Sequence, residues 1–206
     1  MIKNIKNRFP VFKKNPNLVF FDTAASALKV DKMINAINEC YSYEYANIHR
    51  GIYELSSKLT KRYEESRCLV SSFINSHSEN NIIFTKSATE GINLVSSCLS
   101  KNYFQNGDEV LVTTLEHHAN LIPWHLVPKQ IKIISANINK KGELDYTDLI
   151  NKINSKTKLI AISHMSNVTG SITNFEDIKI KAKKYNIPIL IDGCQYVPHK
   201  KLDIKE

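Results

Sequence analysis

The sequence lacks any apolar run long enough to cross a membrane, which takes about 20 residues in a helix. Its basic start, residues 1–8, is followed by no apolar segment of the length that a signal peptide needs. Glycine and proline are scarce, at six each, and no stretch rich in either marks a linker. We therefore expect a cytoplasmic chain with no membrane partner and a single domain over residues 1–206.

Cysteine is also scarce and widely spaced. The four cysteines, Cys40, Cys68, Cys98 and Cys194, include no Cys-x-x-Cys pair. That spacing predicts neither a metal site nor a disulfide framework. Free and mostly buried thiols in a reducing compartment are the expectation.

Acidic residues are outnumbered, because 28 lysines and arginines against 20 aspartates and glutamates give a net charge of +8. Such a balance favours nucleic-acid binding where the basic residues form a dense patch. Here the lysines are scattered, and the densest segment, Lys179–Lys184, is typical of the solvated face of a helix. No nucleic-acid partner is predicted.

What the sequence does contain is the pattern of a globular α/β protein. A hydrophobic fraction of 42% over 206 residues is enough for a sizeable core. Short apolar runs predict strands at Ile82–Thr85, Val110–Thr113, Ile131–Ser135, Leu159–Ser163 and Ile187–Ile191. The segments between them predict helices at Thr89–Lys101, Ala119–Val127, Tyr146–Ile153 and Phe175–Tyr185. This alternation predicts an α/β fold with a mostly parallel sheet and flanking helices.

The segment before these runs is predicted to be mainly helical. Extended stretches at Phe9–Phe12 and Leu18–Phe21 lead into a loop of small residues, 22–27. Helices are expected over Asp31–Tyr45 and Ser56–Ile74, separated by a break at His49–Gly51.

A single carboxylate follows the last apolar run. Asp192 stands where the strand Ile187–Ile191 should end, and Gly193 lets the backbone turn sharply after it. Ligands of open α/β sheets bind just outside the carboxyl ends of the strands. Asp192 is therefore either a ligand-facing acid or an ordinary turn aspartate.

A second feature of that kind follows the run at Ile82–Thr85, where a helix is predicted to begin. Ser87 or Thr89 can cap this helix, and its free backbone N–H groups favour an anion such as phosphate. An ordinary helix cap without a ligand explains the same residues equally well.

Three further polar groups follow other strands. His117 and His118 come after the second run, where they could be ligands, acids or bases, or supply a flat ring that stacks on a ligand; a surface pair without function explains them equally well. Adjacent side chains in a turn point apart, so one shared metal ion is not predicted. Asn167 follows the fourth run, and Gln195 lies three residues after Asp192. A phosphate cup, a flat ring, an amide and a carboxylate together suit pyridoxal 5′-phosphate (PLP), whose pyridinium nitrogen pairs with an acid.

At these residues the chain resembles the N-terminal part of a class V, fold-type I PLP enzyme of the SufS-type cysteine desulfurases. The resemblance covers about residues 9–204 in the family's order, and its Glu-His-His-Ala-Asn…Pro-Trp stretch favours the SufS type over its sister group. The matching stretches are Phe21–Ala27, Asn47–Ser56, Thr89–Val95, Glu116–Trp124, Ser163–Gly170 and Ile191–His199.

The resemblance implies a role for each matching residue. Asp192 would pair with the pyridine nitrogen, and Gln195 would hydrogen-bond the phenolic oxygen of PLP. His117 would stack on the ring and relay protons as a catalytic residue, with Asn167 near the ring substituents. Ala88 and Thr89 would bind the phosphate. The substrate mouth would be shaped by Ala24, His49 and Arg50.

Two positions depart from the family pattern. The phosphate loop reads Ser87-Ala88-Thr89 where the family usually has Gly-Thr-Thr, which removes a hydroxyl but leaves the N–H cup. Cys194 replaces a small residue, and we interpret it as a packing residue rather than as the sulfur acceptor.

The family's Ser-Gly-His-Lys stretch, whose lysine attaches PLP, does not occur in the 206 residues, nor does the C-terminal small domain with the catalytic cysteine. The resemblance therefore implies a truncated PLP-binding large domain, inactive alone. In this fold two further strands would lie between the strand at Thr85 and the strand at Ile191, so we expect unpaired edges and aggregation.

The implied function is conversion of L-cysteine to L-alanine, with a persulfide passed to a sulfur-acceptor protein of the SUF system for iron–sulfur cluster assembly. The full-length enzyme would be a homodimer. Two alternatives stay open: a fragment of a related class V enzyme, such as a selenocysteine lyase or a kynureninase-like protein, or a non-catalytic α/β binding module.

Overall fold

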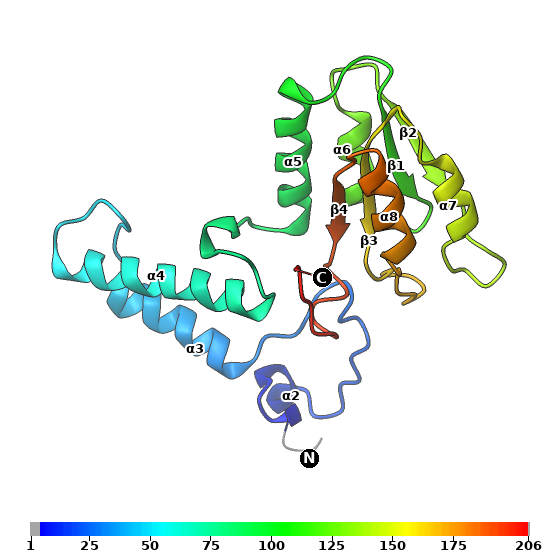
Figure 1. Cartoon of the computed structure of the whole chain (residues 1–206). Coiled ribbons are helices and arrows are strands. Elements are labelled where there is room, and N and C mark those ends of the chain that lie inside the picture. Colours follow the sequence, from blue (N-terminus) through cyan, green and yellow to red (C-terminus); the bar gives the residue numbers. More distant parts are fainter. Residues whose placement is uncertain (1–4, 206) are drawn as a thin grey trace. The chain divides into compact units, whose positions relative to one another are not determined.

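The computed structural model describes residues 5–205 of the chain (Figure 1). These residues divide into two compact units, one formed by residues 5–82 with 203–205 and the other by residues 83–202. Each unit is described by itself below. None of the described helices is long and apolar enough to span a membrane.

The first unit is helical. Its helices are α2 (Pro10–Lys14), α3 (Asp31–Glu39), which continues into a π-helical turn η1 (Cys40–Glu44), α4 (Glu54–Phe73) and a 3-10 turn η2 (Glu79–Asn81). The extended stretch predicted at Phe9–Phe12 is wrong, because Pro10 occupies the first turn of α2, where its missing N–H and fixed φ are tolerated. Only Phe9, the residue before the proline, is extended.

The second unit has an α/β arrangement. Its elements are α5 (Ala88–Asn102), β1 (Glu109–Thr113), η3 (His118–Asn120), α6 (Ile122–His125), β2 (Lys132–Ala136), α7 (Tyr146–Lys152), β3 (Thr157–Ser163), α8 (Glu176–Lys184) and β4 (Ile189–Asp192). The four strands form one parallel sheet in the order β2-β1-β3-β4. The predicted parallel sheet with flanking helices is thereby confirmed.

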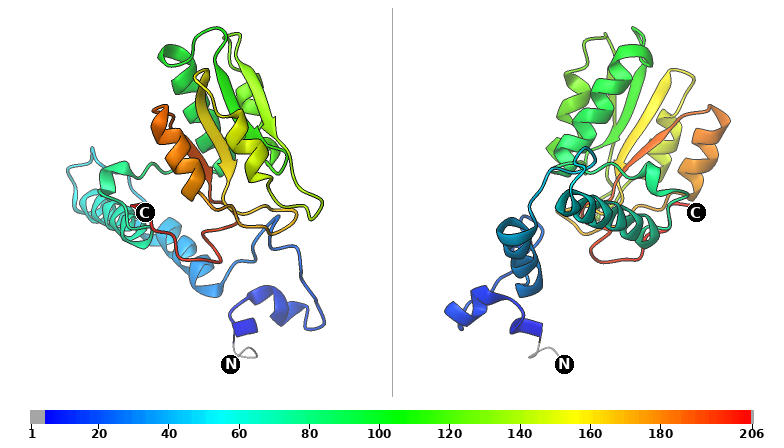
Figure 2. Two further views of the ribbon diagram at one scale, coloured as in Figure 1. Left: turned by 45° about the vertical axis from the view of Figure 1, so that its right-hand side comes forward. Right: turned by 90° about the vertical axis from the view of Figure 1, so that its left-hand side faces the viewer.

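Alternate side chains of the central strands enter two separate hydrophobic clusters. On β1, Val110 and Val112 pack with Trp124 and residues of α5, whereas Leu111 packs with Leu149 and residues of α7 and α8. The sheet is therefore covered on both faces, by α5 and α6 on one side and by α7 and α8 on the other, as the two views in Figure 2 show. All five residues of β1 are buried.

The strand predicted at Ile82–Thr85 is not formed. Ile82 is extended, but residues 82–85 form no regular secondary structure, no described strand pairs with them, and Ile83 is 72% exposed. A strand is stabilised by the hydrogen bonds of its ladder, so an apolar run without a partner has no ladder to join.

Two other expectations need correction. The helix predicted over Ala119–Val127 is broken at Leu121 into η3 and the short α6, because Pro123 has no N–H with which to continue a helix and is tolerated only in the first turn of α6. The cysteines are free, as predicted, but not mostly buried: three are exposed, and Cys40 is intermediate. Cys68 and Cys98 lie on α4 and α5, where a thiol contributes too little apolar area to decide which helix face packs inward.

Candidate functional site at the carboxyl edge of the sheet

The carboxyl ends of parallel strands meet at the same edge of a sheet, and three strands of this sheet are followed there by predicted site residues. His117 follows β1, Asn167 follows β3, and Asp192 is the last residue of β4, with Gln195 in the turn after it. The order β2-β1-β3-β4 reverses direction between β1 and β3, which is the topological switch point of the sheet. Ligands of open α/β sheets bind beside such a point.

The start of α5 forms the predicted anion cup. Ser87 caps the helix by accepting a hydrogen bond from the Glu90 N–H at 3.1 Å, and the Glu90 carboxylate accepts from the Lys86 N–H in return. The N–H groups of Ala88 and Thr89 make no hydrogen bond within the described residues. Two free donors at the positive end of a helix of 15 residues suit an anion.

His117 is held by its own turn. Its backbone is the N-cap of η3, and its Nδ1 accepts a hydrogen bond from the Ala119 N–H at 3.1 Å. An acceptor Nδ1 requires the neutral tautomer that carries its proton on Nε2. The ring is exposed and tilted by 48° from that of His118.

One cavity brings the anion cup and the histidine turn together. It has a volume of about 290 Å³ and is lined by Thr89, Asn93, His117, His118, Ala119, Ile122 and Pro123. Thr89 was expected to contact a phosphate and His117 a flat ring, and the two side chains share this cavity. Asn93 and His118 also line it, and sequence analysis assigned neither to the cofactor.

Asp192 is only partly exposed at the tip of β4. Its Oδ1 accepts a hydrogen bond from the Cys194 N–H at 2.9 Å, so this residue closes a turn, as the simpler interpretation predicted. Its Oδ2 accepts no hydrogen bond within the part of the chain that the structure describes. The local turn thus fixes one oxygen and leaves the other available to a ligand.

Asn167 and Gln195 lie in turns at the same edge. Asn167 is exposed in a turn that Ser166 organises, because the Ser166 hydroxyl accepts from the N–H groups of Val168 and Thr169, each at 3.2 Å. Gln195 is partly buried in the turn after β4. Their assigned contacts to PLP stay predictions.

Glu116 is a site residue that sequence reasoning did not single out. Its carboxylate accepts four hydrogen bonds, from Thr113 Oγ1, Asn120 Nδ2, Ser163 N and Ser163 Oγ. Burial raises the pKa of Glu116, and these hydrogen bonds lower the same pKa without cancelling that effect. An acid three residues after the end of a buried strand and directly before a histidine was the available signal.

The predicted substrate-mouth residues belong to the other unit. His49 has a positive φ of 68°, donates its N–H to Thr60 Oγ1 at 2.9 Å, and places its Nε2 3.5 Å from the Glu64 carboxylate. Arg50 is exposed, and Ala24 lies in an exposed turn. Their role at the substrate mouth stays a prediction.

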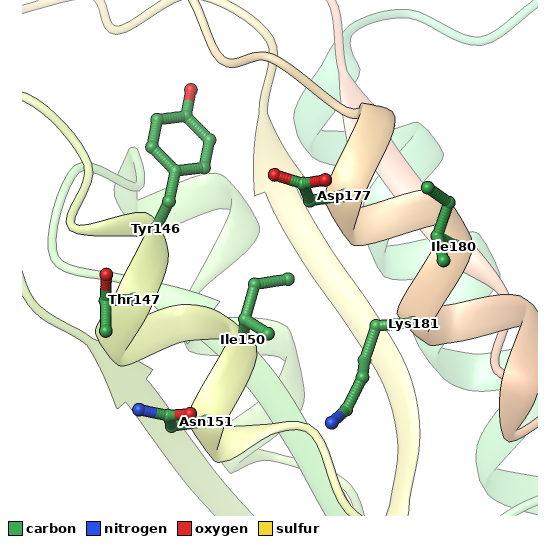
Figure 3. A pocket seen from close by; sticks show the side chains of 7 residues that line it. All are labelled: Tyr146, Thr147, Ile150, Asn151, Asp177, Ile180 and Lys181. Atoms are coloured by element: carbon green, nitrogen blue, oxygen red, sulfur yellow. The ribbon is translucent and has the colours of Figure 1, made fainter.

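A larger cavity lies away from the strand ends. It measures about 420 Å³ between α7 and α8, and its walls are Tyr146, Thr147, Ile150, Asn151, Asp177, Ile180 and Lys181 (Figure 3). None of the predicted site residues lines it, so its greater volume does not make it the better candidate. Among the described residues no cluster of three histidine, cysteine or acidic side chains could hold a metal ion.

Comparison with known proteins gives the family. Residues 19–206 match the aminotransferase class-V family. The chain belongs to the class-V aminotransferase family. It is 40% identical over 210 residues to the cysteine desulfurase SufS of Plasmodium falciparum, and 36% identical over 209 residues to a cysteine desulfurase of Serratia proteamaculans. These matches cover 99% of this chain but only 38% and 52% of the two relatives.

Solved structures agree with the sequence relatives. The apo cysteine desulfurase of Thermococcus onnurineus superposes with a TM-score of 0.90 at 32% identity, over 98% of this chain and 50% of that one. The cysteine desulfurase CsdA of Escherichia coli gives 0.87 at 31% identity. The expected SufS-type resemblance and fold are confirmed, and the chain corresponds to about half the length of these relatives.

The class-V family uses PLP, and the residues at the sheet edge fit this cofactor. The anion cup at Ala88 and Thr89 has two free donors, the cavity joins that cup to the His117 ring, and Asp192 keeps one oxygen available at the end of β4. A phosphate, a flat ring and a pyridinium nitrogen each have a chemically matched group. The binding of PLP by these residues stays a prediction.

Proposed function

We propose that this chain supplies the cofactor-binding part of a SufS-type cysteine desulfurase, which converts L-cysteine to L-alanine and passes sulfur as a persulfide to an acceptor protein for iron–sulfur assembly. The observation that carries the proposal is the cavity shared by Thr89 and His117 at the carboxyl edge of the sheet. The identity to cysteine desulfurases over the whole chain supports the choice of reaction.

In this proposal each residue acts on a stated part of PLP. The N–H groups of Ala88 and Thr89 bind the phosphate, and Asp192 Oδ2 keeps the pyridine nitrogen protonated. Bound PLP supplies an electron sink for the substrate carbon. Gln195 binds the phenolic oxygen, and His117 lies on the ring with its Nε2–H as a proton donor.

The lysine that attaches PLP and the cysteine that takes up sulfur have no matching motif in the 206 residues. We propose that turnover requires a further polypeptide segment that carries both residues, whether in the same protein or in a partner chain. L-cysteine as substrate, a homodimeric assembly and a SUF-system acceptor belong to that complete enzyme.

The test is a fusion of this chain to the remainder of the Serratia proteamaculans cysteine desulfurase, beginning where the match to this chain ends. We expect a PLP absorbance band and alanine production from L-cysteine, both lost in Asp192→Ala. Asp177→Ala, an exposed aspartate on α8, is the matched control and should keep both. A folded Asp192→Ala fusion with an unchanged PLP spectrum would refute the role of Asp192.

The same fusion separates the alternatives. Turnover of L-selenocysteine or L-kynurenine in preference to L-cysteine would favour a related class V enzyme. A well-folded, monodisperse 206-residue chain together with a fusion that binds no PLP would instead favour the non-catalytic module.

A further inference from the structure

The carboxylate of Glu116 joins the ends of two neighbouring strands. Its Oε1 accepts from Thr113 Oγ1 at 2.7 Å, at the end of β1, and from the Ser163 N–H at 3.1 Å, at the end of β3. Its Oε2 accepts from Ser163 Oγ at 2.8 Å. Because β1 and β3 flank the topological switch point, this acid lies at the carboxyl ends of the two strands beside which ligands of such sheets bind.

The same carboxylate also closes the turn that carries His117. Oε2 accepts from Asn120 Nδ2 at 2.7 Å, and this bond spans the three residues between Glu116 and Asn120. Asn120 is fully buried, and its Oδ1 has no hydrogen-bond partner within the described chain. The orientation of the Asn120 amide is therefore set by the carboxylate, which accepts hydrogen bonds and cannot donate them.

The contact that fixes the histidine tautomer lies within this turn, residues 116–120. The Ala119 N–H points at His117 Nδ1 from 3.1 Å, and the Asn120 N–H donates to the His117 carbonyl oxygen at 2.8 Å. Both donors lie within the turn that Glu116 closes. Once released from Glu116, the turn keeps the bond from the Trp124 indole to the Asn120 carbonyl oxygen at 3.0 Å, but it loses the side-chain bond that ties Glu116 and Asn120, its two ends, together.

We propose that Glu116 is a positioning residue that, by closing the 116–120 turn, holds the Ala119 N–H against His117 Nδ1 and thereby keeps the neutral His117 proton on Nε2. That atom lies on the side of the ring away from the Ala119 N–H. The proposal deepens the role of His117 in the proposed function, because it determines which ring nitrogen has a proton to donate. Its test needs no cofactor.

The experiment records histidine side-chain ¹⁵N NMR spectra of the fusion protein described above, prepared without PLP, at about pH 8, above the ordinary histidine pKa. In the wild-type protein we expect Nε2 of His117 protonated and Nδ1 unprotonated. In Glu116→Ala the ratio of the two tautomers should shift toward Nδ1–H by about five- to tenfold, the equivalent of one lost hydrogen bond. A folded Glu116→Ala protein with the wild-type ratio would overturn the proposal.

A conservative variant makes the test sharper. Glu116→Gln should restore the wild-type tautomer, because the Asn120 amide can rotate and offer its unpartnered Oδ1 to the new amide N–H. Failure of this rescue in a folded protein would also contradict the proposal, since it would show that something other than hydrogen-bond geometry is required.

Two further variants separate positioning from general stability. Glu109→Ala removes a buried acid at the first residue of β1, whose carboxylate accepts from Asn154 Nδ2 at 2.8 Å, at the opposite end of the strand from Glu116. It should lower the melting temperature without moving the His117 tautomer. If Glu116→Ala does not fold, Asn120→Ala removes the bond that closes the 116–120 turn and leaves the other three hydrogen bonds of Glu116 in place. It must then shift the ratio of the His117 tautomers in the same direction. Loss of PLP binding by the fusion leaves this result unaffected.

Discussion

The imidazole ring of His164 stacks on the phenol ring of Tyr196, with 3.4 Å between the ring centroids and 7° between the ring planes. The edge of Phe175 meets the same imidazole at 5.1 Å and 87°. The backbone N–H of His164 also donates to the Asp192 carbonyl oxygen at 2.9 Å. The stack therefore fastens the turn that carries Gln195 to the end of β3.

This packing makes stability depend on pH. Burial lowers the pKa of His164 from its ordinary 6.5, and its Nδ1 has no partner among the described residues. The unfolded chain therefore takes up this proton at higher pH than the folded one, and stability is lost as pH falls from 6.5 through the folded pKa. His164→Phe keeps an aromatic ring but cannot titrate.

We expect the free energy of unfolding to fall less between about pH 7 and pH 5 in His164→Phe than in the wild type, as measured by urea titration at each pH. His125→Phe replaces an exposed histidine of α6 and should leave the wild-type slope unchanged. Equal slopes for the wild type and His164→Phe would show that His164 does not contribute.

A second prediction concerns the indole of Trp124, which is fully buried and donates to the Asn120 carbonyl oxygen at 3.0 Å. Trp124→Phe leaves that buried carbonyl without its donor and should lower the free energy of unfolding by about 1–3 kcal/mol. Circular dichroism is the probe, because Trp124 is the only tryptophan. The control Tyr103→Phe removes an exposed donor to a backbone carbonyl and should change stability by less than about 0.5 kcal/mol.

A third prediction compares two glycines. A Cβ on Gly51 would lie 2.2 Å from Ser56 Oγ, whose hydroxyl donates to the Asn47 carbonyl oxygen, so Gly51→Ala should destabilise the chain by about 1–3 kcal/mol. Gly91 lies inside α5 with its nearest such neighbour at 3.5 Å, so Gly91→Ala should stabilise it by about 0.5–1 kcal/mol. Thermal unfolding of both variants decides, and shifts in the same direction would contradict this account.

A fourth prediction concerns activity of the chain alone. Incubated with PLP and L-cysteine, the purified 206-residue chain should produce no alanine and show no absorbance of covalently attached PLP. The Serratia enzyme under the same conditions is the positive control. Steady alanine production by the chain alone would mean that one of its own residues replaces the missing lysine.

The centre of the sheet could be predicted from the sequence because its strands β1 and β3 are buried on both faces. Continuous apolar runs such as Val110–Thr113 and Leu159–Ser163 are too short for a buried helix and are typical of fully buried strands, and each forms part of a strand. The run at Ile82–Thr85 has the same character but no partner strand within residues 5–205. Apolar composition shows that a segment suits a strand, whereas pairing depends on other parts of the chain.

The location of the candidate residues at one edge of the sheet was predictable from the sequence. Because parallel strands end at one edge, His117, Asn167 and Asp192 could be grouped before any coordinates. The hydrogen bonds of Glu116 could not be predicted from the sequence, since they depend on how Thr113, Asn120 and Ser163 approach each other in space. The pairing of Thr89 with His117 in one cavity likewise depends on how α5 packs against the sheet.

The outer edge of β4 has one further consequence. Within the described residues β4 pairs only with β3, and Ile191 is 46% exposed, so a row of backbone donors and acceptors faces outward. Capture of a strand from the same polypeptide is a first-order event, whereas capture of a strand from another copy is second-order. The balance between the two therefore depends on the concentration of newly made chains. A low expression rate keeps that concentration low and favours pairing with a strand of the same polypeptide.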